Sequence, residues 1–136
     1  MATQVTLREE KLAMQMERFP QVQVVRIPAP GLVELIEQGL TDTPETEALL
    51  RQILTPYVGK LDALVLGCTH YPFVKGTITR ILGDVPLFDG GEGTARHTLH
   101  CLAEKGLLRE GQGSVTVENS RCSGQMLELC YQLLEE

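Results

Sequence analysis

The chain has 136 residues, the length of a single domain with room for a hydrophobic core. It carries 12 lysines and arginines against 18 aspartates and glutamates, and the net charge of −6 argues against nucleic acid or an anionic membrane as a partner. Hydrophobic residues make up 43% of the chain, as in folded rather than disordered proteins. No apolar run approaches the ~18 residues of a membrane span, and no signal peptide is visible.

Apolar spacing and turn residues divide the chain into alternating helices and strands. In chain order the predicted elements are helix 6–19, strand 22–27, helix 32–38, helix 44–58, strand 63–66, helix 72–82, strand 85–88, helix 91–105, strand 114–118 and helix 124–134. Thr43 is expected to cap the third helix, with Pro44 at its first position. The alternation and the continuous apolar run at 63–66 predict an α/β fold, in which helices flank a parallel sheet.

The cysteines show no paired spacing, and without a secretion signal they predict free thiols in a reducing cytoplasm. They are Cys68, Cys101, Cys122 and Cys130. His97, His100 and Cys101 fall close together on one predicted helix, where they could approach a metal ion. A packed or solvent-facing helix explains them better, because the spacing is not that of a zinc site. We therefore expect no metal site.

The chemistry of the sequence concentrates in the run Gly67-Cys68-Thr69-His70-Tyr71-Pro72. Gly67 ends a predicted buried strand and lets the backbone turn. Cys68 is thus expected at the carboxyl end of a parallel strand and at the start of a helix, where open α/β sheets bind ligands and where a thiolate is stabilised. His70 could move a proton at Cys68, and Thr69 offers a hydroxyl. From the residues alone, a small buried cysteine at a strand end explains the run equally well.

This run, preceded by Leu64-Val65-Leu66, resembles the second cysteine motif of bacterial glutamate racemases, which belong to the aspartate/glutamate racemase superfamily. Residues 1–6, 32–37 and 86–89 resemble further segments of the same family, and the likeness weakens only after Gly106. The resemblance implies a Rossmann- or flavodoxin-like α/β lobe of that superfamily. It also implies a cytoplasmic enzyme without a cofactor, which interconverts L- and D-glutamate for peptidoglycan synthesis.

The resemblance further implies roles for single residues. Such racemases use two cysteines on opposite faces of the substrate: one removes the α-proton, and the other returns a proton to the planar intermediate. The residues implied are Cys68, His70 and Glu37 for catalysis, and Thr69, Thr3 and Thr6 for substrate binding. Cys68 is one of the two bases, His70 adjusts it, and Glu37 is a supporting charge. Considered alone, Glu37 is equally well explained as a solvated charge on a short helix.

The sequence also departs from this family. It contains no Asp-Ser pair, no Pro-Tyr-Gly segment and no Cys-Asn-Thr motif, which the family carries in its first lobe. Residues 1–110 therefore resemble the second lobe alone, and residues 111–136 resemble a C-terminal strand and helix that return to the first lobe. Without that lobe the apolar stripe of helix 124–134 needs another partner. We expect a homodimer, which could form by exchange of residues 114–136 across the joint at 111–113.

Three functions stay open at this point. The first is a part of a glutamate racemase that holds one of the two catalytic cysteines and is inactive by itself. The second is a non-catalytic or regulatory module that binds small acids, and the third is a related decarboxylase or isomerase with one cysteine. A second thiol within ~8 Å of Cys68 would separate catalysis from binding. Cys122, in a predicted loop, is the only loose candidate, since Cys101 and Cys130 are expected to pack within helices.

Overall fold

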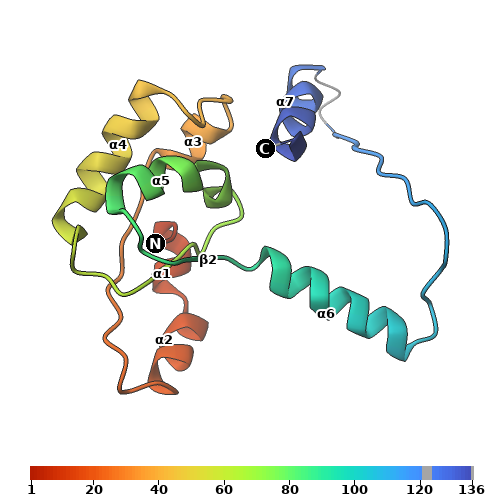
Figure 1. Ribbon diagram of the computed structural model, residues 1–136, viewed down its shortest axis with the longest axis horizontal. Helices are drawn as coiled ribbons and strands as arrows, with labels where there is room; N and C mark the ends of the chain where they lie inside the picture. The colour runs from red at the N-terminus through yellow and green to blue at the C-terminus, as the bar shows by residue number, and fades with distance from the viewer. Residues whose placement is uncertain (121–123, 136) are drawn as a thin grey trace. The chain divides into compact units, whose positions relative to one another are not determined.

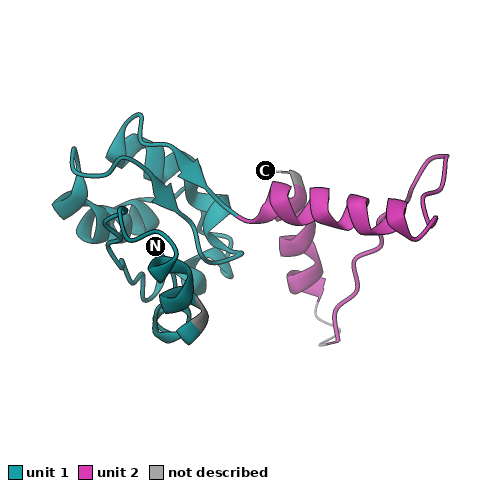
Figure 2. Cartoon of the chain, turned by 90° about the horizontal axis from the view of Figure 1, so that it is seen from below, with its two compact units in different colours: residues 1–89 teal, residues 90–136 magenta. Residues whose placement is uncertain are grey.

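The computed structural model describes residues 1–120 and 124–135, and it divides into two compact units, residues 1–89 and 90–136 (Figure 1, Figure 2). The elements of the first unit are α1 (Gln4–Arg8), α2 (Glu10–Glu17), α3 (Leu32–Ile36), α4 (Pro44–Leu54), the 3-10 helix η1 (Thr55–Tyr57), β1 (Leu64–Val65), the 3-10 helix η2 (Tyr71–Val74), α5 (Lys75–Leu82) and β2 (Leu87–Phe88). The second unit contains α6 (Gly91–Glu104) and α7 (Gly124–Glu135).

A small parallel sheet runs through the first unit and confirms the predicted α/β class. Strands β1 and β2 pair in parallel, with the register Leu64 to Leu87 and Val65 to Phe88. Two short segments extend the pairing, because residues 1–2 bond to β1 on one side and to residues 27–29 on the other. The order across the sheet is therefore 27–29, 1–2, β1, β2, and all four segments run in the same direction.

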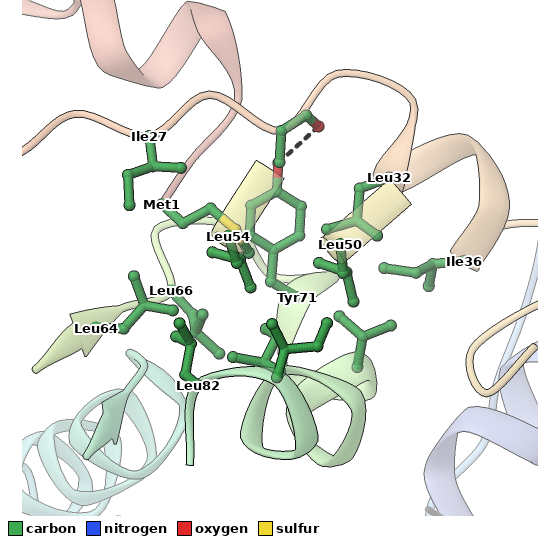
Figure 3. Close-up of a cluster of buried hydrophobic side chains, with 14 residues drawn as sticks. Met1, Ile27, Leu32, Ile36, Leu50, Leu54, Leu64, Leu66, Tyr71 and Leu82 are labelled. Carbon is green, nitrogen blue, oxygen red and sulfur yellow. Dashed lines mark hydrogen bonds between the residues drawn. The ribbon is translucent and has the colours of Figure 1, made fainter. Parts of the chain in front are cut away.

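The hydrophobic core fills the space between one face of this sheet and helices α3, α4 and α5 (Figure 3). Among its fully buried side chains are Ile27, Leu32, Ile36, Leu50, Leu54, Tyr71 and Ile78. Each large apolar side chain that leaves water contributes ~1.5–3 kcal/mol to folding. The other face of the sheet is open to solvent, since Val65 is 60% exposed and its register partner Phe88 is 57% exposed.

Most helices form close to their predicted places. The Thr43 hydroxyl accepts a hydrogen bond from the Thr46 amide at 3.4 Å, and Pro44 begins α4, as the sequence predicted. The helix predicted over 44–58 ends earlier and continues as η1, and the helix predicted over 72–82 begins as η2 before α5. The apolar run at 63–66 contains β1, as expected.

Three predicted elements differ in the structure. The helix predicted over 6–19 is two helices, because Glu9 adopts an extended backbone between α1 and α2. The strand predicted over 22–27 is wrong: only Pro28 forms a bridge, to Ala2, because the neighbouring segment offers little chain for pairing before α1 begins. The strand predicted over 114–118 is also wrong, since no strand of the described chain pairs with this β-branched run.

The described residues of the second unit form no buried core. Across residues 90–120 and 124–134 no residue is buried. Large exposed apolar side chains of this unit include Leu99, Leu107, Leu108, Val115 and Leu134. Within the described ranges, no helix combines the length and the apolar character that crossing a membrane requires. The division predicted from the sequence, into a lobe of residues 1–110 and a C-terminal segment 111–136 that returns to another lobe, stays a prediction.

Candidate active site

The predicted site residues of the first unit lie around the carboxyl edge of the parallel sheet. Thr3 directly follows the paired residues 1–2, and Cys68 follows β1 after a two-residue step. Glu37 comes at the end of α3, the helix that follows residues 27–29. The carboxyl ends of parallel strands meet at one edge, which is where open α/β sheets bind their ligands. The topology thereby gathers residues that are distant in sequence.

An imidazole connects a thiol to a carboxylate at this edge. Sγ of Cys68 lies 3.8 Å from Nδ1 of His70, and Nε2 of the same ring lies 3.3 Å from Oε1 of Glu37. When Nε2 carries the proton that Glu37 accepts, Nδ1 presents a lone pair to the thiol. The thiol can then pass its proton to the ring, as in other sites where an oriented base activates a cysteine. We call Cys68, His70 and Glu37 the relay.

Solvent limits what the relay contributes to stability. The side chain of Glu37 is 55% exposed and that of His70 is 33% exposed, so their contact adds at most ~1 kcal/mol to folding. Its effect is to fix the orientation of the ring and the nitrogen that holds the proton. Cys68 is half-buried and packs partly against the core.

A close backbone approach fixes the start of the Cys68 loop. The Gly67 amide donates to the Met1 carbonyl at 2.9 Å, and the amino group of Met1 donates to the Val65 carbonyl at 2.7 Å. A Cβ atom on residue 67 would lie only 3.1 Å from Cβ of Ala2. Glycine therefore allows the N-terminal segment to lie against the end of β1, in agreement with the turn predicted at this position.

Tyr71 anchors the same loop in the core, a role that sequence analysis missed. Its ring is fully buried, and its hydroxyl donates to the Ala29 carbonyl at 3.4 Å, as Figure 3 shows. Burial raises the pKa of Tyr71 to about 12, and the nearby charges of Cys68 and Glu34 add to the rise. The only signal in the sequence is a large aromatic residue directly after a polar run.

The predicted binding threonines have different environments. The hydroxyls of Thr3 and Thr6 lie 3.0 Å apart, and Oγ1 of Thr3 also accepts from the Thr6 amide at 3.3 Å. This pair caps the start of α1, which explains the Thr-x-x-Thr spacing as ordinary helix capping. Thr69 is exposed beside Cys68. A role of these hydroxyls in substrate binding stays a prediction.

The other cysteines lie in the second unit. Sγ of Cys101 is 3.6 Å from Nε2 of His97, one turn earlier on α6, while His100 pairs with Glu104 at 3.4 Å. Within the described part of the chain, no three potential ligands gather into a metal site. Cys130 is half-buried on α7, and Cys122 lies outside the described residues.

The chain is similar over its whole length to known enzymes. It is 39% identical to the glutamate racemase of Clostridium botulinum over 140 residues, which cover 99% of this chain and 54% of that enzyme. The glutamate racemase structure from Thermus thermophilus, in complex with β-chloro-D-alanine, matches with a TM-score of 0.66 at 32% identity, covering 86% of this chain and 48% of that one. A glutamate racemase isoform from Bacillus anthracis matches with a TM-score of 0.76 at 25% identity, covering 99% and 52%. No protein-family model matches the chain.

The parallel-sheet fold and these matches make the chain similar to about half of an α/β amino-acid racemase. Within that class it is related to the glutamate racemases, which confirms the resemblance drawn from the cysteine motif. The chain spans about half the length of the curated relatives that it matches.

Proposed function

We propose that this chain provides one half of the active site of a glutamate racemase, in which Cys68 is the acid–base group on one face of the α-carbon. The observation that carries the proposal is the relay at the carboxyl edge of the sheet. The 39% identity to glutamate racemases supports the choice of reaction and of substrate. We place the reaction in the cytoplasm, where the free thiols stay reduced.

The geometry suggests how the thiol is prepared for proton transfer. Glu37 accepts the proton of Nε2, so Nδ1 of His70 takes the proton of the Cys68 thiol. The resulting thiolate removes the α-proton of glutamate and becomes a thiol again, while the electron pair of the broken C–H bond remains on the planar α-carbon. Return of a proton from the same thiol restores the starting enantiomer. Inversion requires a second acid on the opposite face.

Neighbouring hydroxyls would hold the substrate against this thiol. Thr69 is exposed beside Cys68, and the Thr3–Thr6 pair follows the adjacent segment of the sheet. Hydroxyls both donate and accept, so they suit the carboxylate and the amine of an amino acid. The scheme needs neither a metal nor a cofactor.

The sequence contains no Cys-Asn-Thr, the motif that would carry the second acid–base cysteine. Loss of one acid–base partner typically lowers a rate by ~10²–10⁴-fold. We therefore propose that the chain alone exchanges the α-proton slowly and without inversion, and that inversion needs a further lobe.

Deuterium exchange tests this proposal. L- and D-glutamate are incubated separately with the full chain in D₂O, with α-deuterium followed by NMR and the enantiomer ratio by chiral chromatography. We expect slow deuterium incorporation into one enantiomer, abolished in Cys68→Ala and unchanged in Cys101→Ala. The Cys101 variant is a matched control because this thiol also has a histidine nitrogen at 3.6 Å.

Each other outcome contradicts part of the proposal. Binding of glutamate without exchange would favour a non-catalytic module that recognises small acids. Release of CO₂ would indicate a decarboxylase instead. Rapid inversion that disappears in Cys68→Ala would show that the chain holds both acid–base groups.

We also propose that the second unit joins two copies of the chain. Its described residues leave large apolar side chains in solvent, and such surfaces tend to find a partner. Exchange of residues 114–136 across the glycines at 111 and 113 would provide one. Light scattering should give twice the chain mass of 15.0 kDa, and a deletion of residues 114–136 should give a monomer. A mass of 15.0 kDa for the full chain would refute this part.

A further inference from the structure

Both ends of the segment 66–75, which carries Cys68 and His70, contact the end of strand β2. Where the segment begins, the Leu66 amide donates to the Phe88 carbonyl at 2.7 Å. Where it ends, the Lys75 ammonium forms an ion pair with Oδ2 of Asp89. Because Phe88 and Asp89 are consecutive, the segment is a loop closed at its base by the end of β2.

Backbone hydrogen bonds stiffen this loop between the thiol and Lys75. In three overlapping turns, an amide donates to the carbonyl three residues earlier. The amide of Tyr71 donates to Cys68 at 3.3 Å, that of Phe73 to His70 at 3.2 Å, and that of Lys75 to Pro72. A displacement at Lys75 is therefore transmitted along the turns to the cysteine and the histidine.

The ion pair that closes the loop is better shielded than the relay. The carboxylate makes the difference: the side chain of Asp89 is 16% exposed, against 55% for Glu37, whereas Lys75 is 42% exposed and His70 is 33% exposed. A contact of this kind can hold geometry as well as add stability. Neither Lys75 nor Asp89 was assigned a role from the sequence. The one signal available was the position of Asp89, an aspartate directly after a predicted strand.

We infer that Lys75 and Asp89 are a positioning pair. By fixing the end of the loop 66–75 to the end of β2, the pair holds Cys68 within reach of His70. The inference rests on the proposed function of Cys68. Lys75 and Asp89 act through the loop, and they take no part in proton transfer.

Helix α5 supplies a matched control for a purely structural role. Arg80, in its last turn, forms an ion pair with Asp42 and also donates to Thr77 at 2.9 Å. Both ion pairs fasten the same helix, but only the pair of Lys75 closes the cysteine loop. If fastening α5 were all that mattered, losing either pair would affect Cys68 alike.

The test measures how the rate of Cys68 alkylation by iodoacetamide depends on pH, by peptide mapping of the full chain. His70→Asn provides the reference profile, because this variant has no imidazole ring to accept the proton of the Cys68 thiol. We expect Lys75→Met and Asp89→Asn to move the parental profile toward that reference, with a rate at neutral pH lower by about two- to fivefold, the range for one such ion pair. Lys75→Arg and Arg80→Met should keep the parental profile.

The outcomes separate this inference from the proposed function. If His70→Asn changes the profile while Lys75→Met and Asp89→Asn do not, the positioning pair is refuted and the relay stands. If Arg80→Met shifts the profile as much as Lys75→Met, the pair only fastens α5. If His70→Asn itself changes nothing, the relay fails and leaves nothing to position. Should Lys75→Met not fold, Asp89→Asn decides by the same criteria.

Discussion

Tyr71 should make the stability of the first unit fall steeply in alkali. Its pKa rises from 10.0 in the unfolded chain to about 12 in the folded one, mainly because the ring is buried. Below pH 10.0 both states keep the phenolic proton, so stability is unaffected; above it, the unfolded state loses the proton first and is favoured. A difference of about two units corresponds to at most ~2.7 kcal/mol, lost between pH 10.0 and about 12.

Replacing Tyr71 by phenylalanine removes this loss and one weak hydrogen bond. The bond to Ala29 is long at 3.4 Å, so we expect the variant to be less stable than the parent near neutral pH by ~0.5–1.5 kcal/mol. Between pH 10.0 and about 12 the loss of the parent grows past this amount, so the two stability curves should cross before about pH 12. Urea unfolding followed by circular dichroism at several pH values measures both curves.

Every other ionisable group is present in both proteins, so the difference between the curves isolates Tyr71. Tyr131→Phe is the control, because that ring is 51% exposed, and its curve should follow the parent. Curves of Tyr71→Phe and the parent that stay parallel up to about pH 12 would refute the assigned burial effect.

Three further predictions concern the site and the core. Cys68 should be alkylated before Cys101 at neutral pH, because a carboxylate orients the imidazole beside Cys68; peptide maps with Cys101 labelled first would contradict this. Leu50→Ala should cost ~2–5 kcal/mol in denaturant unfolding, since the side chain is fully buried, and a loss below ~1 kcal/mol would place it outside the core. Gly31→Ala should lower the unfolding midpoint, because residue 31 has a φ of 81°, whereas Gly93→Ala within α6 should leave it unchanged or raise it.

Local signals predicted the parts of the fold that depend on neighbouring residues. The Thr43 cap and Pro44 identify the start of α4 because capping is decided within three residues. The strand predicted over 22–27 failed because strand formation needs a partner, and composition does not reveal how much chain a partner offers. Glu9 interrupts a helix whose apolar spacing continues across it, which no local pattern shows.

The candidate site divides in the same way. The contact of Cys68 with His70 spans two residues and was expected from the motif. That Glu37 reaches the second ring nitrogen of His70 depends on the packing of α3 beside the loop, so the sequence supported it only through a family resemblance. The ion pair of Lys75 with Asp89 joins two segments through the sheet register, which periodicity does not specify.

The position of the N-terminal residues in the sheet has a kinetic consequence. Met1 lies between segments that follow it, and its amino group bonds to Val65, 64 residues away in sequence. The helices from α3 to α5 can begin to pack through closer contacts, but the sheet is complete only when residues 1–2 lie between residues 27–29 and β1. Contacts of such long range form slowly. Since the Gly67 amide also bonds to Met1, we expect the reactivity of Cys68 to develop in this last and slowest step of refolding.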